Sequence, residues 1–190
     1  MKKLEVRMAA GEKIYIIKGD ITDQGTDAIV NAANPSLMGG GGVDGAIHRI
    51  GGSKILEECK RIRAKDWPNG LPTGKAVITS GGNLKAKYVI HTVGPIWFGG
   101  NRGEQELLTD AYRNPLMLAV KKGLKTISFP SISTGAYGYP IEKASEVALT
   151  VVKEFLDEQK DLGKVAFVLF SQHDFQVYKE TARRILEENP

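Results

Sequence analysis

Short apolar runs alternate with longer amphipathic stretches along most of this chain of 190 residues. Residues 165–170 form one continuous apolar run, which is typical of a strand that other elements cover on both faces. From Pro140 onward, apolar side chains recur at spacings of three and four residues, which is the period of a helix packed on one side. This alternation predicts an α/β fold in which helices cover both faces of a central sheet.

The same patterns predict where the elements lie. Strands are expected at 3–8 and 13–18, joined by a turn at Ala10–Gly11, and at 28–30, 75–79, 88–93, 126–129 and 165–170. Helices are expected at 42–65 with a break near Gly51–Gly52, at 104–122, from Pro140, and at the end of the chain with Asp174 as the cap. Pro115 is expected to kink or divide the helix at 104–122, because proline lacks a backbone donor and collides with the preceding turn.

Composition and charge limit the class of protein. A chain of this length is expected to form one domain, residues 1–190, and it carries a net charge of +4 with a pI near 9.1. That excess suits an anionic ligand but is too small and scattered for a nucleic-acid groove, so we expect no nucleic-acid partner. No signal peptide and no apolar run of about 20 residues is visible, which predicts a cytoplasmic protein without a membrane partner. The oligomeric state stays open, with a monomer favoured.

The single cysteine, Cys59, excludes an internal disulfide and any cysteine-based zinc cluster. His48 and His91 are expected to be structural hydrogen-bonding residues, because no second histidine or cysteine stands at ligand spacing to either. We therefore expect neither a metal nor a cofactor.

Residues 31–45 contain two carboxamides, Asn31 and Asn34, then glycines at 39–42, then the carboxylate of Asp44. Consecutive glycines allow backbone N–H groups to approach a bulky anion without interference from a Cβ atom. Electrostatics alone would not place an acid beside a phosphate, so we infer a catalytic role for Asp44. The competing interpretation is structural, because a carboxylate in the first turn of a helix is stabilised by roughly 0.3–1 kcal/mol.

Three polar or glycine-rich segments directly follow predicted strands, at 31–42, 131–138 and 171–174. In open α/β sheets, ligands bind outside the carboxyl ends of the strands. If these strands are parallel, the three segments meet at one edge of the sheet. Two glycine-rich loops that face each other suit a pyrophosphate better than a monophosphate.

Five motifs occur in order along nearly the whole chain: Gly19-Asp-Ile-Thr22, Asn31-Ala-Ala-Asn34, Gly39 to Arg49, Tyr88 to Pro95 and Phe129 to Gly138. Together they resemble the macrodomain family, in its MacroD-type branch. The resemblance implies a three-layer α/β/α fold with a mixed central sheet and helices on both faces. It also implies a metal-independent hydrolase that removes mono-ADP-ribose from acidic side chains of proteins and deacetylates O-acetyl-ADP-ribose. The implied partners are ADP-ribose, O-acetyl-ADP-ribose and mono-ADP-ribosylated proteins.

The resemblance also assigns roles to residues. Asp20 would accept a hydrogen bond from the adenine amino group, and Phe170 would stack on the ring. Asn34 would bond the distal ribose, near Tyr137, while Asp44 orients or activates a water molecule. The predicted catalytic residues are thus Asp44 and Asn34. The predicted ligand-binding residues are Asp20, Ile21, Thr22, Asn31, Ala32, Ala33, Gly39, Gly40, Gly41, Gly42, Val43, Ile132, Ser133, Thr134, Gly135, Ala136, Tyr137, Gly138 and Phe170.

Several of these residues have a structural alternative. Asp20 could cap a short helix, Asn31 could tie down its own loop, and Phe170 could belong to the core. A non-catalytic reader of ADP-ribose would need the same glycine loops, but it would not require Asn34 together with Asp44. The sequence leaves open which ester is the physiological target and whether Asp44 acts as a base. Loop 96–103 contains no motif that we can assign.

Overall fold

The computed structural model describes residues 3–7 and 13–187, so the expected turn at Ala10–Gly11 lies outside the described residues. The described strands form one seven-stranded mixed sheet in the order β1-β2-β7-β6-β3-β5-β4. The five inner strands β2, β7, β6, β3 and β5 are parallel, and the edge strands β1 and β4 run antiparallel to their neighbours. The bounds are β1 Lys3–Arg7, β2 Lys13–Lys18, β3 Ala28–Ala33, β4 Ala76–Ser80, β5 Tyr88–Val93, β6 Thr126–Phe129 and β7 Lys164–Leu169.

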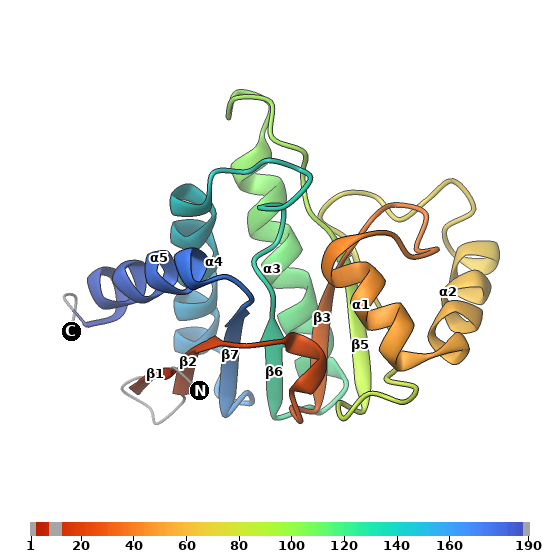
Figure 1. Cartoon of the computed structure of the whole chain (residues 1–190), viewed down its shortest axis with the longest axis horizontal. Helices are drawn as coiled ribbons and strands as arrows, with labels where there is room; N and C mark the ends of the chain where they lie inside the picture. Colours follow the sequence, from red (N-terminus) through yellow and green to blue (C-terminus); the bar gives the residue numbers. More distant parts are fainter. Residues whose placement is uncertain (1–2, 8–12, 188–190) are drawn as a thin grey trace.

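Helices cover both faces of this sheet (Figure 1). Their bounds are η1 Ile21–Asp23, α1 Gly42–Gly51, α2 Ser53–Lys65, α3 Glu104–Lys121, α4 Ile141–Glu158, α5 Gln172–Ala182 and η2 Arg183–Glu187. One core joins α3, α4 and α5 to the sheet, and a second core joins α1 and α2 to the opposite face. Strand β7 contributes Phe167 to the first core and Val168 to the second, which is why its sequence is apolar throughout. The three-layer α/β/α architecture with a mixed sheet is therefore confirmed.

Most predicted element bounds agree with the structure within one or two residues, and the break near Gly51–Gly52 is present because Gly52 adopts a φ of 81°. Strand β3 is longer than predicted and ends at Ala33 instead of residue 30. This extension places Asn31 inside the sheet and not in the loop that follows it. No helix among the described residues has the length and hydropathy needed to cross a membrane.

The structure contradicts the predicted division of the helix at 104–122 and the predicted cap of the last helix, whereas a kink at Pro115 stays a prediction. Helix α3 is not divided at Pro115 but continues through it, because Ala111, Tyr112 and Leu116 around the proline are fully buried and hold the helix in place. Asp174 does not cap α5. The cap is Ser171, whose Oγ accepts a hydrogen bond from the Asp174 backbone N–H at 3.0 Å.

Candidate functional site

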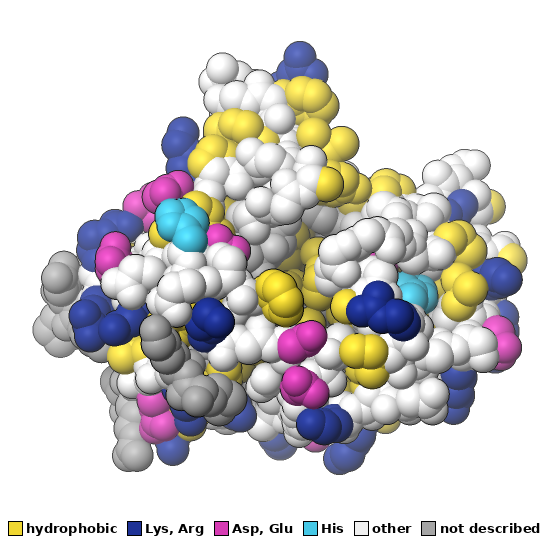
Figure 2. All heavy atoms as spheres, viewed as in Figure 1, with side chains coloured by type: hydrophobic (Ala, Val, Ile, Leu, Met, Phe, Trp, Pro, Cys, Tyr) yellow, Lys and Arg dark blue, Asp and Glu magenta, His cyan; other side chains and the backbone are white. Residues whose placement is uncertain are grey.

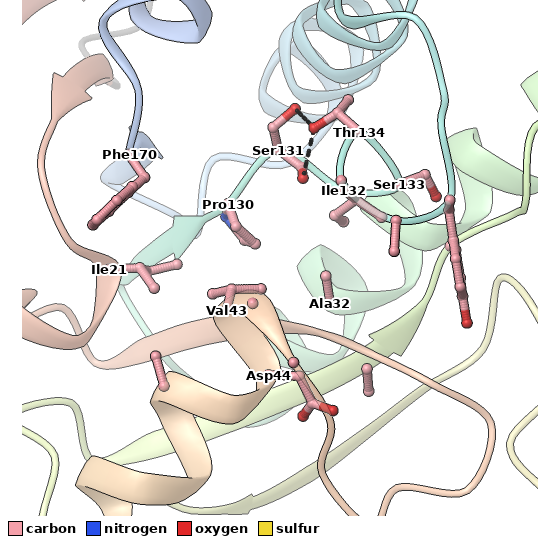
Figure 3. A pocket seen from close by; sticks show the side chains of 18 of the residues that line it. Ile21, Ala32, Val43, Asp44, Pro130, Ser131, Ile132, Ser133, Thr134 and Phe170 are labelled. Carbon is pink, nitrogen blue, oxygen red and sulfur yellow. Dashed lines mark hydrogen bonds between the residues drawn. The ribbon is translucent and has the colours of Figure 1, made fainter.

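The loops that follow β3, β6 and β7 meet at one edge of the sheet, as predicted, because these three strands are adjacent and parallel. They surround a cavity of about 790 Å³, within the usual range for small-molecule sites. The face of the molecule that carries this cavity is hollowed near its centre (Figure 2). The start of α1 forms one wall, and the loop after β6 forms the wall opposite (Figure 3).

Most of the predicted site residues line this cavity. They are Asp20, Ile21, Ala32, Ala33, Asn34, Gly40, Gly41, Gly42, Val43, Asp44, Ile132, Ser133, Thr134, Gly135, Ala136, Tyr137 and Phe170. Four predicted residues, Thr22, Asn31, Gly39 and Gly138, do not line it. The lining also includes residues that the sequence analysis did not select: Gly19, Ala46, Arg49, Gly94, Pro130, Ser131, Val168, Leu169 and Asp174.

One end of the cavity is formed by the segments that follow β2 and β7. Phe170 is 81 % exposed and lies directly after the last residue of β7, so the alternative that it belongs to the core is wrong. Ile21 lies at the same end (Figure 3). Asp20 caps η1, since its Oδ1 accepts from the Thr22 backbone N–H at 2.9 Å and from the Thr22 hydroxyl at 2.7 Å. Asp20 therefore both caps η1 and lines the cavity, whereas Thr22 is buried and does not line it.

Backbone donors dominate the middle of the cavity. Helix α1 begins after Gly41, which provides no side-chain cap, and the first residues of the helix line the cavity. The first N–H groups of a helix have no partner within the helix, so they are available to a bound anion. Of the ionisable side chains in the lining, Asp20, Asp44 and Asp174 are acidic and only Arg49 is basic. A bound anion must therefore be held mainly by backbone N–H groups and the dipole of α1.

The opposite loop offers fewer backbone donors than we predicted. The Ile132 N–H donates to the Tyr112 hydroxyl at 3.0 Å, and the Gly138 N–H donates to the Gly135 carbonyl at 3.0 Å. Both groups are thus used within the protein, which leaves residues 133–137 as the segment that can donate to an anion. Ser133 adopts a φ of 67°, a left-handed conformation that non-glycine residues rarely adopt and that often marks a functional loop.

Asp44 lies in the first turn of α1 and is only 5 % exposed. Its Oδ1 accepts a hydrogen bond from Asn31 Nδ2 at 2.7 Å, and His48 Nε2 lies 3.4 Å from the same oxygen. A Cβ atom at Gly40 would stand 3.1 Å from Asp44 Oδ2 and 3.2 Å from Asn34 Nδ2. Glycine at this position therefore keeps open the space between the two predicted catalytic side chains.

The two asparagines differ in their place relative to the cavity. Asn31 is fully buried within β3, outside the lining, and holds Asp44 instead of tying down its own loop. Asn34 lines the cavity but also ties down its own loop, since its Nδ2 donates to the Gly39 carbonyl at 2.9 Å. Its Oδ1 accepts from the Ser36 backbone N–H at 3.0 Å. Gly39 thus supports Asn34 and does not face the cavity.

Behind Asn31 lies a buried chain of hydrogen bonds. The Thr79 hydroxyl donates to the Ser80 carbonyl, so it accepts from His91 Nε2 at 3.0 Å, and His91 Nδ1 then accepts from Asn31 at 3.1 Å. Burial, with a smaller contribution from His48, lowers the pKa of His91 to about 4, so its ring is neutral at physiological pH. This chain fixes the orientation of Asn31 and hence of Asp44.

The structural hydrogen-bonding role predicted for His91 is confirmed by its bonds to Asn31 and Thr79. The sequence showed no histidine or cysteine at ligand spacing to either histidine, but the fold brings such side chains together. His48, Cys59 and His91 each bring one ligand atom to within 4.8 Å of the other two. The expectation rested on sequence spacing, which says nothing about residues from three different elements.

Two missed lining residues had a signal in the sequence. Ala46 and Arg49 follow Val43 at steps of three residues, so a helix that starts at Gly42 presents all three on one side. Asp174 belongs to the segment 171–174, which the sequence already placed at this edge of the sheet, although it was not selected as a site residue. Gly94 had no such signal, because its place in the cavity depends on the order of the strands. An added Cβ atom at Gly94 would collide with the Ser133 hydroxyl, so this glycine permits the close approach of the loop after β6.

Comparison with known proteins agrees with this geometry. The model of the family described as Macro domain matches residues 30–148. A macro domain-containing protein of Caldanaerobacter subterraneus is 61 % identical over 89 % of this chain and 95 % of its own length. A protein of Citrobacter rodentium named O-acetyl-ADP-ribose deacetylase is 51 % identical over 88 % of this chain and 93 % of its own. The structure of an Oceanobacillus iheyensis macrodomain with ADP superposes with a TM-score of 0.94 and 46 % identity, covering 98 % of both chains. The chain belongs to the macrodomain family.

Proposed function

We propose that this protein binds ADP-ribose and hydrolyses acyl esters of its distal ribose. The substrates we propose are O-acetyl-ADP-ribose and proteins that carry mono-ADP-ribose on acidic side chains. The observation that carries the proposal is Asp44, a nearly buried carboxylate held by Asn31 in a cavity whose other features bind anions through the backbone. The relative named O-acetyl-ADP-ribose deacetylase, at 51 % identity, supports the ester chemistry.

The ligand has a defined place in this proposal. Adenine stacks on the exposed ring of Phe170, and its amino group donates to Asp20 Oδ2, since Oδ1 already accepts from Thr22. The diphosphate lies between the first turn of α1 and residues 133–137, where backbone N–H groups face it from both sides. The distal ribose then reaches Asn34 and Tyr137, next to Asp44.

In the proposed reaction, Asp44 orients or activates the water that attacks the acyl carbon. The bond between that carbon and the ribose oxygen breaks, and the proton lost by water is taken up by the leaving ribose oxygen. The Asn31 hydrogen bond holds the Asp44 carboxylate in one orientation at the start of α1, which the orienting role requires.

The experiment that tests this proposal replaces Asp44 by Asn and measures binding and turnover separately. We expect Asp44→Asn to bind ADP-ribose in calorimetry, while release of acetate from O-acetyl-ADP-ribose and of ADP-ribose from a glutamate-modified protein falls by about 100-fold or more. Asp157→Asn, on the exposed side of α4, is the matched control and should behave as the wild type.

Three outcomes would count against the proposal. Undiminished turnover in Asp44→Asn would remove the role of the acid. Binding without turnover of either substrate in the wild-type protein would favour the non-catalytic reader, whose adenine and phosphate contacts would be the same. Absence of binding to free ADP-ribose would remove both interpretations.

A further inference from the structure

Three side chains that commonly bind metals converge behind Asp44. His48 comes from α1, Cys59 from α2 and His91 from β5, and their ligand atoms all lie within 4.8 Å of one another. Cys59 and His91 are fully buried. Asp44 lines the cavity and lies 3.4 Å from His48, so it connects the cavity to the cluster.

The distances within this cluster approach those of a tetrahedral site. Cys59 Sγ lies 3.8 Å from His91 Nε2, and His48 Nε2 lies 3.4 Å from Asp44 Oδ1. Zinc bonds of roughly 2.0–2.3 Å in a tetrahedron place neighbouring ligand atoms about 3.3–3.6 Å apart. Each of these two pairs is therefore close to the spacing of two zinc ligands. Asp44 is not among the three side chains whose ligand atoms all lie within 4.8 Å of one another, so it must move toward Cys59 and His91 to become the fourth ligand.

Unpartnered polar atoms gather at the same place. Buried polar side-chain atoms normally have a hydrogen-bond partner. Within residues 3–7 and 13–187, only Asn31 Oδ1, His48 Nε2 and Ser133 Oγ are buried without one, and the first two belong to this cluster. A cation would satisfy His48 Nε2 directly. In the structure Asn31 Nδ2 lies 3.1 Å from His91 Nδ1 and also donates to Asp44. Binding of the metal at His91 Nε2 leaves the proton on Nδ1, so the Asn31 amide must rotate to present Oδ1 as its acceptor, which also releases Asp44.

The charges of the cluster also balance. In the free protein Cys59 is a fully buried free cysteine. On coordination the S–H bond breaks, the metal–sulfur bond forms and the proton leaves to solvent, with no electron transferred. A divalent cation together with one thiolate, one carboxylate and two neutral imidazoles has no net charge, which a buried site requires.

We propose that His48, Cys59, His91 and Asp44 form a binding site for a single zinc ion, and that the occupied site inhibits hydrolysis. Two imidazoles, one thiolate and one carboxylate are a donor set that zinc accepts in four-coordinate geometry. The inhibitory part rests on the proposed function, since a metal-bound Asp44 can no longer direct water at the ester. The binding part does not depend on it.

Binding is tested with Co²⁺, which reports tetrahedral thiolate coordination by its absorption. Titration of the reduced wild-type protein should produce a thiolate-to-cobalt charge-transfer band that saturates at one equivalent and disappears when Zn²⁺ is added. Cys59→Ala should lack the band, and Cys59→Ser, which preserves the volume of the side chain, provides a second variant if Cys59→Ala does not fold. A wild-type protein without this band at saturating Co²⁺ would overturn the proposal.

Inhibition is tested with the same variants, because Cys59 is not part of the cavity. Zn²⁺ should inhibit release of acetate from O-acetyl-ADP-ribose by the wild type, and a chelator should restore it. Cys59→Ser and Cys59→Ala should keep the basal rate but need at least ~10-fold more Zn²⁺ for half-inhibition, since even the loss of an outer partner weakens metal sites by that factor. Equal sensitivity of wild type and variants would refute the inhibitory site, whereas an inactive wild type that still shows the cobalt band would refute only the proposed hydrolysis.

Discussion

At the scale of single residues, the hydrolysis that we propose depends on a narrow space between two side chains. Gly40 lies between Asp44 Oδ2 and Asn34 Nδ2, and each side chain is oriented by a hydrogen bond, from Asn31 to Asp44 and from Asn34 to the Gly39 carbonyl. Enzyme rates respond strongly to misplacement, with roughly 100-fold lost for about 1 Å. The glycine is therefore expected to matter for turnover more than for folding.

Gly40→Ala tests this expectation. The new Cβ atom would stand 3.1 Å from Asp44 Oδ2 and 3.2 Å from Asn34 Nδ2, closer than side chains normally pack. We expect kcat to fall by about 10-fold or more with little change in Tm, because the backbone of Gly40 is not in the left-handed region. Gly25→Ala, where a Cβ atom meets nothing within 4 Å, is the control. A kcat of the variant equal to that of wild type would contradict the argument.

At the scale of elements, the loop between β5 and α3 is organised by one carboxylate. Glu104, at the start of α3, is 2 % exposed and accepts N–H bonds from Phe98 at 2.9 Å, Gly100 at 3.1 Å and Arg102 at 2.6 Å. The same loop is tied to the cavity, because the Trp97 N–H donates to the Tyr137 carbonyl at 2.9 Å. Loop 96–103, which contains no assignable motif, is therefore held in place beside the cavity by these hydrogen bonds.

Glu104→Gln should destabilise the protein in a pH-dependent way. Burial alone would raise the pKa of Glu104, but the backbone donors outweigh it and lower the pKa from 4.5 to about 2. Because the pKa of Glu104 is lower in the folded protein than in the unfolded chain, the ionised carboxylate stabilises the folded state. This stabilisation is complete above a pH of about 4.5 and is lost as the pH falls from about 4.5 to about 2. The Tm difference between wild type and Glu104→Gln should therefore be largest near neutral pH and shrink in acid.

The matched control for that measurement is Glu106→Gln, an exposed carboxylate in the same helical turn. It should leave Tm nearly unchanged across the pH range, since surface charges contribute little to stability. A Tm difference for Glu104→Gln that stays constant down to low pH would mean that the hydrogen bonds do not depend on the charge of Glu104.

At the scale of the whole molecule, the two cores are joined by the strands that they share. Strand β7 supplies Val165 and Phe167 to the core on one face and Ala166 and Val168 to the core on the other. If either helical layer unfolds, apolar side chains of the shared strand β7 become exposed to solvent. The two cores should therefore lose their structure together.

Calorimetry of thermal unfolding should accordingly show one transition, with a calorimetric enthalpy equal to the van't Hoff enthalpy. Saturating ADP-ribose should move this transition to higher temperature as a single peak. A free ligand concentration of 100 times Kd adds about 2.7 kcal/mol to the free energy of unfolding. Two separate transitions, or a shift of only part of the peak, would contradict both the shared-core argument and the expectation of a single domain.

The sequence by itself determined the layers and the edge of the sheet at which the cavity lies. The apolar period of a strand or helix is a property of neighbouring residues, and the amide-rich segments at 31–42 and 131–138 directly follow their strands. These features are local, so a linear pattern can reveal them. Phe170 was assigned differently, by the resemblance to the macrodomain family, because its place at the end of an apolar run indicates a core position on composition alone.

Only the tertiary structure decided which side chains become partners. Asn31 holds Asp44 because β3 extends to Ala33 and turns that side chain inward, and no local pattern predicts this. Likewise, His48, Cys59 and His91 meet because α1, α2 and β5 pack against one another, although they are far apart along the chain. Contacts of this kind depend on strand order and helix packing, which are set by the whole core and not by spacing in the sequence.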